Sequence, residues 1–209
     1  MTQATPELPP SEERRGAPRF ALLFRTAKVV VDQKEYLCVL RDASATGCKI
    51  RLFHALPTGA EFALELGNGG RYPADVMWHS DDYAGLRFKS EIDVGRLLSD
   101  NYGQYPKRQI RMKFDRPALV TAQGRSFEVL LRNISQQGAC IECSHVLRVL
   151  EPVSIEIEGF PLIYGKVCWR RSSRHGVVFE RGFGLTELAG LLGHLHCTTA
   201  GQFSFSPSS

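Results

Sequence analysis

Hydrophobic and polar residues alternate along several short stretches of the chain. In the segment 62–66 a phenylalanine and two leucines occupy every second position, and the segment 153–157 repeats the pattern with valine and isoleucine. A period of two places one apolar set on a single face of a β-strand. Further strands are predicted for apolar, β-branched or aromatic runs between polar turns, at 28–31, 36–40, 48–53, 72–78 and 84–88. About six short strands in roughly 70 residues predict a small antiparallel barrel, whose closure removes exposed sheet edges.

The chain contains an internal repeat with an offset of 91 residues, the separation between Asp42 and Asn133. The segment 40–47 (LRDASATG) resembles 131–138 (LRNISQQG), and the same offset relates Trp78 to Trp169, Gly85 to Gly176 and Phe88 to Phe179. The period is too long for a solenoid unit and fits two copies of one small domain. The predicted organisation is a disordered tail, a first domain, a linker, a second domain and a second disordered tail, at 1–13, 14–100, 101–106, 107–198 and 199–209.

Each predicted barrel is expected to end in a helix. The segment 91–100 is short and weakly periodic, whereas leucines recur at helical spacing within 184–196. The second segment is therefore predicted to be an amphipathic helix that packs on the second barrel. The predicted fold is mainly β, with two tandem six-stranded antiparallel barrels, each followed by a C-terminal helix.

Composition and charge narrow the function classes. The 209 residues are 43% hydrophobic and 23% charged, as in an ordinary globular protein. No run of about 18 apolar residues predicts a membrane span. The first 13 residues lack a basic region followed by an apolar core, so no secretory signal is predicted and a cytoplasmic location is expected. The net charge of +4 suits an anionic ligand but is too small and too evenly mixed to argue for nucleic acid.

The cysteines and tryptophans are interpreted as structural residues. Cys140 and Cys143 form one CxxC pair without a second pair or a matching histidine pair, which is weak evidence for zinc or thiol chemistry. No cysteine in one copy has a cysteine counterpart in the other, which excludes a cysteine site duplicated with the domain. No metal site, cofactor or catalytic group is predicted. Trp78 and Trp169 lie in alternating strands and are predicted to be core aromatics.

A basic segment precedes the first strand. It reads Arg14-Arg15-Gly16-Ala17-Pro18-Arg19, and its glycine and proline disfavour a helix, so an arm or turn is expected. Guanidinium groups bind phosphate through two parallel hydrogen bonds and stack on planar bases. The segment therefore suits a planar anion, and the alternative is a solvated basic stretch before a domain.

A polar turn follows between two predicted strands, with Asp42, Ser44 and Gly47 at fixed spacing. Such residues are good turn formers, because short polar side chains bond the local backbone and glycine supplies a positive φ. The functional alternative assigns Asp42 to the N–H edge of a base such as guanine and Ser44 to a base or phosphate. In that alternative Gly47 lets the ligand approach the backbone.

Taken together, the two clusters are more specific. Arg-x-x-x-Arg, about twenty residues and then Asp-x-Ser-x-x-Gly resembles the PilZ domain family, over residues 14–100 and again over 106–197. The resemblance implies small β-barrels that bind the bacterial second messenger cyclic di-GMP and act as receptors rather than enzymes. It implies that the arm wraps the nucleotide and that the turn holds a guanine. The residues assigned to these roles are Arg15, Arg19, Asp42, Ser44 and Gly47, with Arg14 at a position associated in the family with an intercalated cyclic di-GMP dimer.

The second copy departs from this pattern in its arm. It keeps the turn residues Asn133, Ser135 and Gly138, and Arg111 corresponds to Arg19. Lys107 stands where the first arm has an arginine, and lysine lacks the planar face and the bidentate fork. Arg108 compensates only if the arm shifts by one residue. We therefore expect cyclic di-GMP to bind the first domain and to bind the second more weakly or not at all.

The leading hypothesis is a non-enzymatic cyclic di-GMP effector that converts nucleotide binding into an interdomain change or a contact with a protein partner, whose identity the sequence does not give. The first alternative is a structural or adaptor tandem PilZ protein that binds no nucleotide. A thiol enzyme using Cys140 and Cys143 is disfavoured, because residues three apart on a strand face opposite sides. A nucleic-acid-binding barrel is the remaining alternative.

Overall fold

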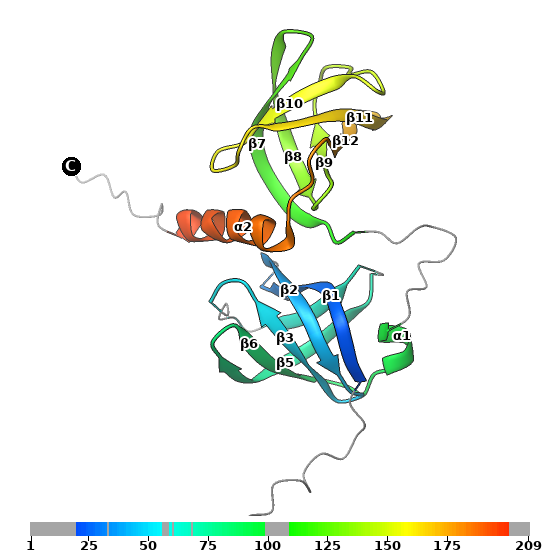
Figure 1. Ribbon diagram of the computed structural model, residues 1–209, viewed down its shortest axis with the longest axis vertical. Coiled ribbons are helices and arrows are strands. Elements are labelled where there is room, and N and C mark those ends of the chain that lie inside the picture. The colour runs from blue at the N-terminus through cyan, green and yellow to red at the C-terminus, as the bar shows by residue number, and fades with distance from the viewer. Residues whose placement is uncertain are drawn as a thin grey trace, which may run out of the picture.

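The computed structural model describes residues 20–32, 34–55, 59, 61–67, 69–98 and 109–200. The fold is mainly β, as predicted: two closed antiparallel barrels of six strands each lie one beyond the other along the long axis (Figure 1). The predicted N-terminal tail and linker lie outside the described residues, as do residues 201–209 of the predicted C-terminal tail. Residues 199–200 of that tail belong to a helix, so the prediction of disorder is wrong for them. No helix in the described ranges is long and apolar enough to cross a membrane.

The first barrel has the strand order β1-β2-β3-β6-β5-β4 and closes by pairing β4 with β1. Its strands are β1 (Phe20–Val31), β2 (Lys34–Ala43), β3 (Gly47–Leu52), β4 (Phe62–Leu66), β5 (Arg71–Ser80) and β6 (Tyr83–Phe88). Strand β3, predicted as an apolar run, also alternates, because Cys48, Ile50 and Leu52 are buried between less buried neighbours.

The second barrel repeats this topology with the order β10-β11-β12-β9-β8-β7. Its strands are β7 (Met112–Ala122), β8 (Arg125–Ile134), β9 (Gly138–Glu142), β10 (Pro152–Glu156), β11 (Ile163–Arg171) and β12 (Arg174–Phe179). Irregularities fall at equivalent places in the two copies. One precedes Asp42 and Asn133, and another precedes Trp78 and Trp169. The repeat in sequence is thus also a repeat of local backbone defects.

Each barrel has its own hydrophobic core. Equivalent side chains are fully buried in the two cores: Leu40, Ile50 and Leu64 in the first, and Leu131, Ile141 and Ile155 in the second. Burying one such side chain contributes about 1.5–3 kcal/mol. Because the two cores use the same positions, the strands of both copies present the same faces inward and outward, and the turns lie at equivalent places on both barrels.

A helix follows each barrel, and the two differ in length. Helix α1 (Val94–Leu98) is little more than one turn, and its Leu97 is buried in the first core. Helix α2 (Leu185–Ala200) extends four residues beyond the predicted end at His196. Leu188 and Leu192 of α2 join the second core, as predicted. The helix also lies between the barrels and contacts β2 (Figure 1).

A buried cluster of charged residues joins the barrels. We call Lys28, Glu35 and Glu65 the interdomain charge cluster. The Lys28 ammonium lies 2.8 Å from a Glu35 carboxylate oxygen and 3.2 Å from Glu65. The other Glu35 oxygen accepts a hydrogen bond of 2.7 Å from the Lys113 backbone N–H, and Lys28 donates one of 3.4 Å to the Arg111 carbonyl. The first barrel is thereby tied to the backbone of the second just before and at the start of β7.

The buried His175 gives the second barrel a predicted pH dependence. It stands where the first copy has Ala84, it is 1% exposed, and its Nε2 accepts a hydrogen bond of 3.3 Å from the Leu147 N–H. Burial lowers the pKa of His175 below its ordinary value. Since the folded state resists protonation, its stability is fully present above a pH of about 6.5 and is lost as pH falls through the lowered pKa.

We expect the free energy of unfolding to fall by up to about 1.4 kcal/mol per pH unit in that window. Urea unfolding followed by Trp169 fluorescence, in a Trp78→Phe background, measures it for the second barrel. His175→Gln keeps an acceptor for Leu147 and removes the titration, so this variant should show a flatter pH profile. An equal slope in the variant would assign the effect to another group.

Candidate functional site

The predicted turn motifs occupy the same position in both barrels, between β2 and β3 and between β8 and β9. The Ser44 N–H and hydroxyl both donate to the Gly47 carbonyl, at 2.8 and 3.2 Å. In the second barrel Ser135 repeats both bonds to Gly138, at 2.8 and 3.0 Å. Both serines are buried. The serine of the motif therefore closes the turn in both barrels. The outer surface of the turn then lies at the equivalent position on each barrel.

The motif glycines are required for close approach and not for a positive φ. Neither Gly47 nor Gly138 has a positive φ, so the expectation that they supply one is wrong. A Cβ on Gly47 would collide with the Leu86 carbonyl oxygen, and one on Gly138 with that of Val177. The neighbouring strand, β6 or β12, thus passes directly over the glycine, which keeps the turn flat against the barrel.

Asn133 carries an unsatisfied atom at the second turn. It pairs with Cys140 directly after an irregularity in β8, and its side chain lines a cavity. Its Oδ1 is buried and has no hydrogen-bond partner among the described residues. A buried acceptor without a partner costs about 1–3 kcal/mol, which a ligand or water donor would recover. The atom is therefore available to a donor group in the cavity.

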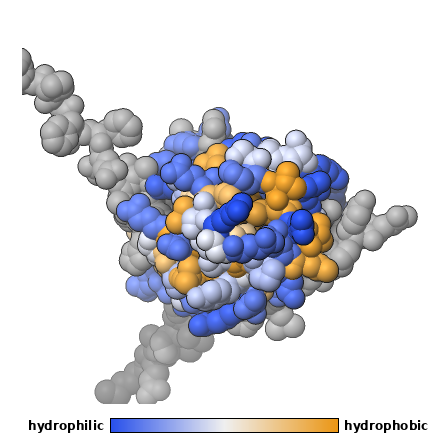
Figure 2. Space-filling model, turned by 90° about the horizontal axis from the view of Figure 1, so that it is seen from above, coloured by the Kyte–Doolittle hydropathy of each residue, from blue (hydrophilic) through white to orange (hydrophobic). Residues whose placement is uncertain are grey.

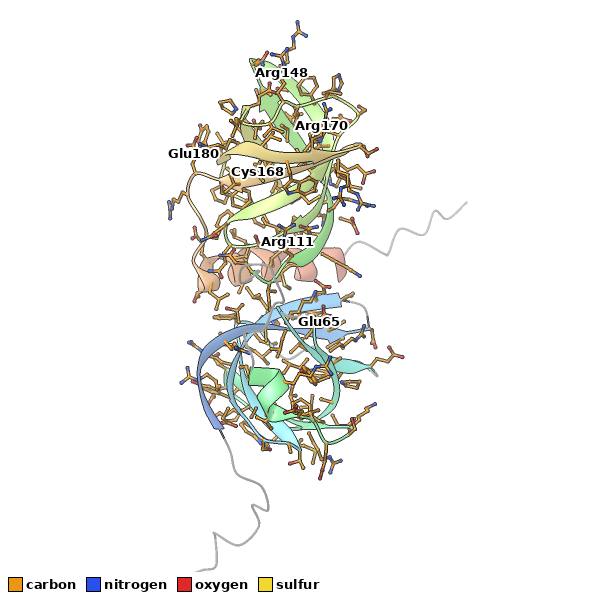
Figure 3. The ribbon with its side chains drawn as sticks, turned by 90° about the vertical axis from the view of Figure 1, so that its right-hand side faces the viewer. Glu65, Arg111, Arg148, Cys168, Arg170 and Glu180 are labelled. Atoms are coloured by element: carbon orange, nitrogen blue, oxygen red, sulfur yellow. The ribbon has the colours of Figure 1, made fainter. Side chains whose placement is uncertain are left out.

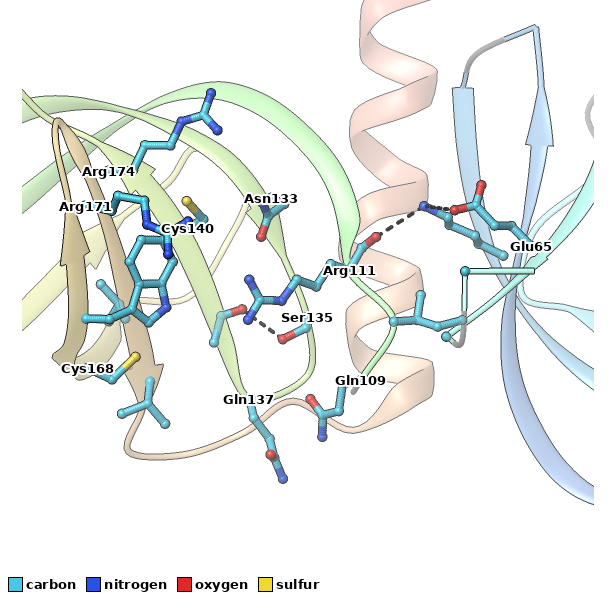
Figure 4. Close-up of a pocket in the computed structure, with 18 of the residues that line it drawn as sticks. Glu65, Gln109, Arg111, Asn133, Ser135, Gln137, Cys140, Cys168, Arg171 and Arg174 are labelled. Atoms are coloured by element: carbon cyan, nitrogen blue, oxygen red, sulfur yellow. Dashed lines mark hydrogen bonds and ion pairs between the residues drawn. The ribbon is translucent and has the colours of Figure 1, made fainter. Parts of the chain in front are cut away.

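The cavity at the second turn has a volume of about 1000 Å³. It brings together four of the predicted second-site residues, Arg111, Asn133, Ser135 and Gly138 (Figure 4). The wall opposite the second barrel comes from the first barrel and includes Lys28 and Glu65. Figure 3 shows Glu65 and Arg111 on the two sides of this junction. The second site thus lies between the barrels.

The cavity at the first turn is smaller, about 190 Å³. Ser44 and Gly47 line it, together with Lys49 and Arg87, whereas Asp42 is not part of its lining. The Lys49 ammonium lies 4.4 Å from the centroid of the Tyr83 ring, a cation–π contact. This site combines positive charge with aromatic surface, which suits a planar anion.

The predicted arm residues fall largely outside the described part of the chain. Arg14, Arg15 and Arg19 precede it, and Lys107 and Arg108 lie between its ranges. Arg111 is the arm residue that is described, and its side chain extends along the surface that carries Asn133 and Ser135 (Figure 4).

The tryptophans line the two candidate sites and are not core residues, which corrects the sequence interpretation. Trp78 is 46% exposed and Trp169 is 37% exposed, and each lines the cavity of its own barrel. The strand irregularity just before each tryptophan turns its ring outward. A Cβ on Gly85 or Gly176 would collide with the ring, so each tryptophan lies flat on a glycine of the neighbouring strand. The sequence held a sign of this packing, because the same offset of 91 residues relates both the two tryptophans and the two glycines.

We expect Gly176→Ala to lift Trp169 from the surface of the second barrel. The added methyl group occupies the position of the indole ring, and overpacking of this kind costs about 1–3 kcal/mol. The emission of Trp169, measured in a Trp78→Phe background, should shift to the red. Gly190→Ala is a matched control, because a Cβ there meets nothing within 4 Å. An unchanged emission in Gly176→Ala would contradict the packing.

Cys140, which lines the second cavity, lacks the environment of a nucleophile. Burial raises the pKa of Cys140, while Arg174 and Arg111 act in the opposite direction. Cys143 is also buried, and the cysteine side chains that the structure describes are free thiols. A thiol whose pKa is raised is a poor nucleophile at neutral pH. Within the described ranges no three His, Cys, Asp or Glu side chains come together as a metal site.

The fold and the paired turns define a protein made of two copies of one small six-stranded barrel. The PilZ domain model matches residues 13–99 and 106–191, and the chain belongs to the PilZ domain family. PilZ-domain homologues are cyclic di-GMP receptors and act as effectors rather than enzymes. No curated protein sequence matches the chain.

Three solved structures resemble most of the length of this chain at low sequence identity. PlzA of Borreliella burgdorferi, in complex with c-di-GMP, is 16% identical with a TM-score of 0.36, over 81% of this chain and 86% of PlzA. The inhibitor of motility MotI/DgrA of Bacillus subtilis is 12% identical with a TM-score of 0.32, over 86% of this chain and 98% of its own. YcgR of Escherichia coli, in complex with c-di-GMP, is 9% identical with a TM-score of 0.30, over 84% of each chain.

Proposed function

We propose that the protein is a non-enzymatic cyclic di-GMP receptor of the bacterial cytoplasm that needs no metal or resident cofactor. The observation that carries the proposal is the convergence of Arg111, Asn133 and Ser135 on one cavity of about 1000 Å³ in a chain of two PilZ domains. The unsatisfied Asn133 oxygen suits the N–H edge of a guanine, and the guanidinium of Arg111 suits a phosphate or the face of a base.

The first domain is proposed as the tighter site. Its arm carries Arg15 and Arg19, with Arg14 before them, and its turn carries the acidic Asp42 where the second copy has an amide. A carboxylate accepts two N–H bonds from a guanine edge, and charge-assisted bonds are stronger than neutral ones. Trp78 adds an exposed ring beside the turn on which a base can stack. In the second domain Lys107 holds the position of Arg15, which weakens stacking.

The output is proposed to be a change in the relation between the barrels, which a protein partner then reads. Two contacts support this. The wall of the second cavity includes Lys28 and Glu65 of the first barrel, and the Arg111 carbonyl is held by Lys28. A nucleotide that draws the Arg111 side chain toward Ser135 acts on the same residue whose backbone meets the first barrel. Rigid-body reorientation of domains is a common form of such a switch.

Titration calorimetry of the full chain with cyclic di-GMP, GTP, single-stranded DNA and duplex DNA tests the proposal. We expect cyclic di-GMP alone to bind in the micromolar range or tighter. Small-angle scattering at saturating nucleotide should differ from the profile of the free protein. Absence of cyclic di-GMP binding would favour an adaptor that acts through protein contacts only, and identical scattering profiles would reject the interdomain change.

A further inference from the structure

The two sites carry their positive charge at different places. In the first barrel Lys49 on β3 faces Tyr83 at the start of β6. The equivalent positions in the second barrel hold Cys140 and Arg174. Replacing a long cation by a buried cysteine leaves space at the centre of the site, and the arginine restores charge at its rim. This exchange accompanies the larger volume of the second cavity, about 1000 Å³ against about 190 Å³.

Two further arginines stand beside Arg174. Arg170 and Arg171 end β11 where the first copy has His79 and Ser80. We call Arg170, Arg171 and Arg174 the hairpin arginines. All three line the second cavity. Arg171 pairs directly with Arg174 across the hairpin, two residues beyond Trp169 and two before Gly176. Because strand side chains alternate between faces, Arg171 and Arg174 share the face on which the tryptophan lies.

The hairpin arginines approach the motif from the side opposite the arm. Arg111 enters the cavity from the start of β7, and the charges of Arg174 and Arg111 both reach the Cys140 thiol, where each lowers its pKa. Asn133, which pairs with Cys140, lies between them in the sheet. An anion placed over this point lies within reach of guanidinium groups from two elements.

The charge of the hairpin is only partly neutralised by nearby carboxylates. Among the residues that the structure describes, no carboxylate forms an ion pair with Arg170 or Arg171. Arg174 is 3.6 Å from Glu142, and the same carboxylate oxygen is 3.0 Å from Arg132. Like charges held together repel each other, and a bound anion relieves that repulsion. The hairpin therefore presents two guanidinium groups, Arg170 and Arg171, that have no carboxylate partner among the described residues, beside Arg174, which shares Glu142 with Arg132.

We propose that the hairpin arginines form a phosphate clamp that completes the second nucleotide site opposite Arg111. The two guanidinium groups of Arg171 and Arg174, side by side on one face of the hairpin, match the two phosphate groups of a cyclic dinucleotide. The clamp would supply the guanidinium contact that Lys107 withholds from the second arm. The proposal rests on the proposed function and adds to it that the second site binds nucleotide through its own set of residues.

The clamp is tested on the second site alone. The background is the full chain with Arg15→Ala and Asp42→Ala, which disables the first site. Cyclic di-GMP is titrated into this background, into the background with Arg171→Ala and Arg174→Ala, and into a matched control with Arg125→Ala and Arg181→Ala. The control removes two exposed arginines of the same barrel that do not line the cavity. Thermal melting of each variant confirms that it is folded.

We expect the clamp variant to bind at least tenfold more weakly than the background, and the control within threefold of it. The clamp variant should also lose affinity less steeply with added salt, because fewer charge contacts remain to be screened. Equal affinity in the background and the clamp variant would overturn the clamp. So would a background that binds no nucleotide although the unaltered chain does. If the unaltered chain also fails to bind, the proposed function itself is wrong.

Discussion

Arg15→Ala should remove most of the affinity of the protein for cyclic di-GMP. Arg15 is the first arginine of the only arm with two arginines at the family spacing. Its guanidinium is expected to stack on a base and bond a phosphate at the same time, which alanine cannot do. Truncating one partner of such a charged contact costs about 2–5 kcal/mol, which corresponds to a loss of thirtyfold or more. Calorimetric titration of the full-length variant measures it.

Two matched variants show which property of Arg15 matters and which domain binds more tightly. Arg15→Lys keeps the charge and loses the planar fork, so its affinity should lie between those of the unaltered protein and Arg15→Ala. Arg111→Ala makes the equivalent change in the second arm and should have the smaller effect on the tight binding event. If binding survived Arg15→Ala and vanished with Arg111→Ala, the ranking of the two domains would be reversed.

The fold could be predicted from the sequence because its determinants are local and occur twice. Alternation in 62–66 fixes which face of β4 is buried, and the same alternation recurs in 153–157. The repeat then required both copies to have one topology, as found in the shared strand order. The position of α2 could not be predicted so fully. Its leucine spacing predicts one apolar face, yet Leu37 of the first barrel also packs into the second core.

The site was predictable where it depends on turn chemistry and not where it depends on strand irregularities. Ser44 and Ser135 bond backbone groups three residues away, a relation visible in the sequence. The outward turn of Trp78 and Trp169 results from a shift in strand register, which alternation alone assigns to the core. Figure 2 shows hydrophilic and hydrophobic side chains interspersed on the face seen from above, so hydropathy does not mark out one site on that face.

The interdomain charge cluster joins residues far apart in the chain, so no local pattern predicts it. Lys28 and Glu35 are about one-tenth exposed or less, and Glu35 is the nearer and more buried of the two carboxylates beside the cation. Glu65, the second partner of Lys28, is more exposed, at 27% of its side chain. Breaking a buried pair on one side leaves an uncompensated charge, which costs more than the pair itself contributes.

Glu35→Gln should therefore lower the free energy of unfolding by about 2–3 kcal/mol and loosen the junction of the barrels. Glutamine can still accept the hydrogen bond from the Lys113 backbone N–H, so the measured loss of stability reports the removal of the carboxylate charge. Adding Lys28→Met removes the cation that Glu35→Gln leaves with Glu65 as its remaining carboxylate partner, and should recover much of the stability. Asp82→Asn is the matched control, because the Arg51–Asp82 pair is exposed on both sides and contributes no more than about 1 kcal/mol. Urea unfolding measures stability and scattering measures the loosening. A cost for Glu35→Gln no larger than that of the control would mean that the cluster does not hold the barrels together.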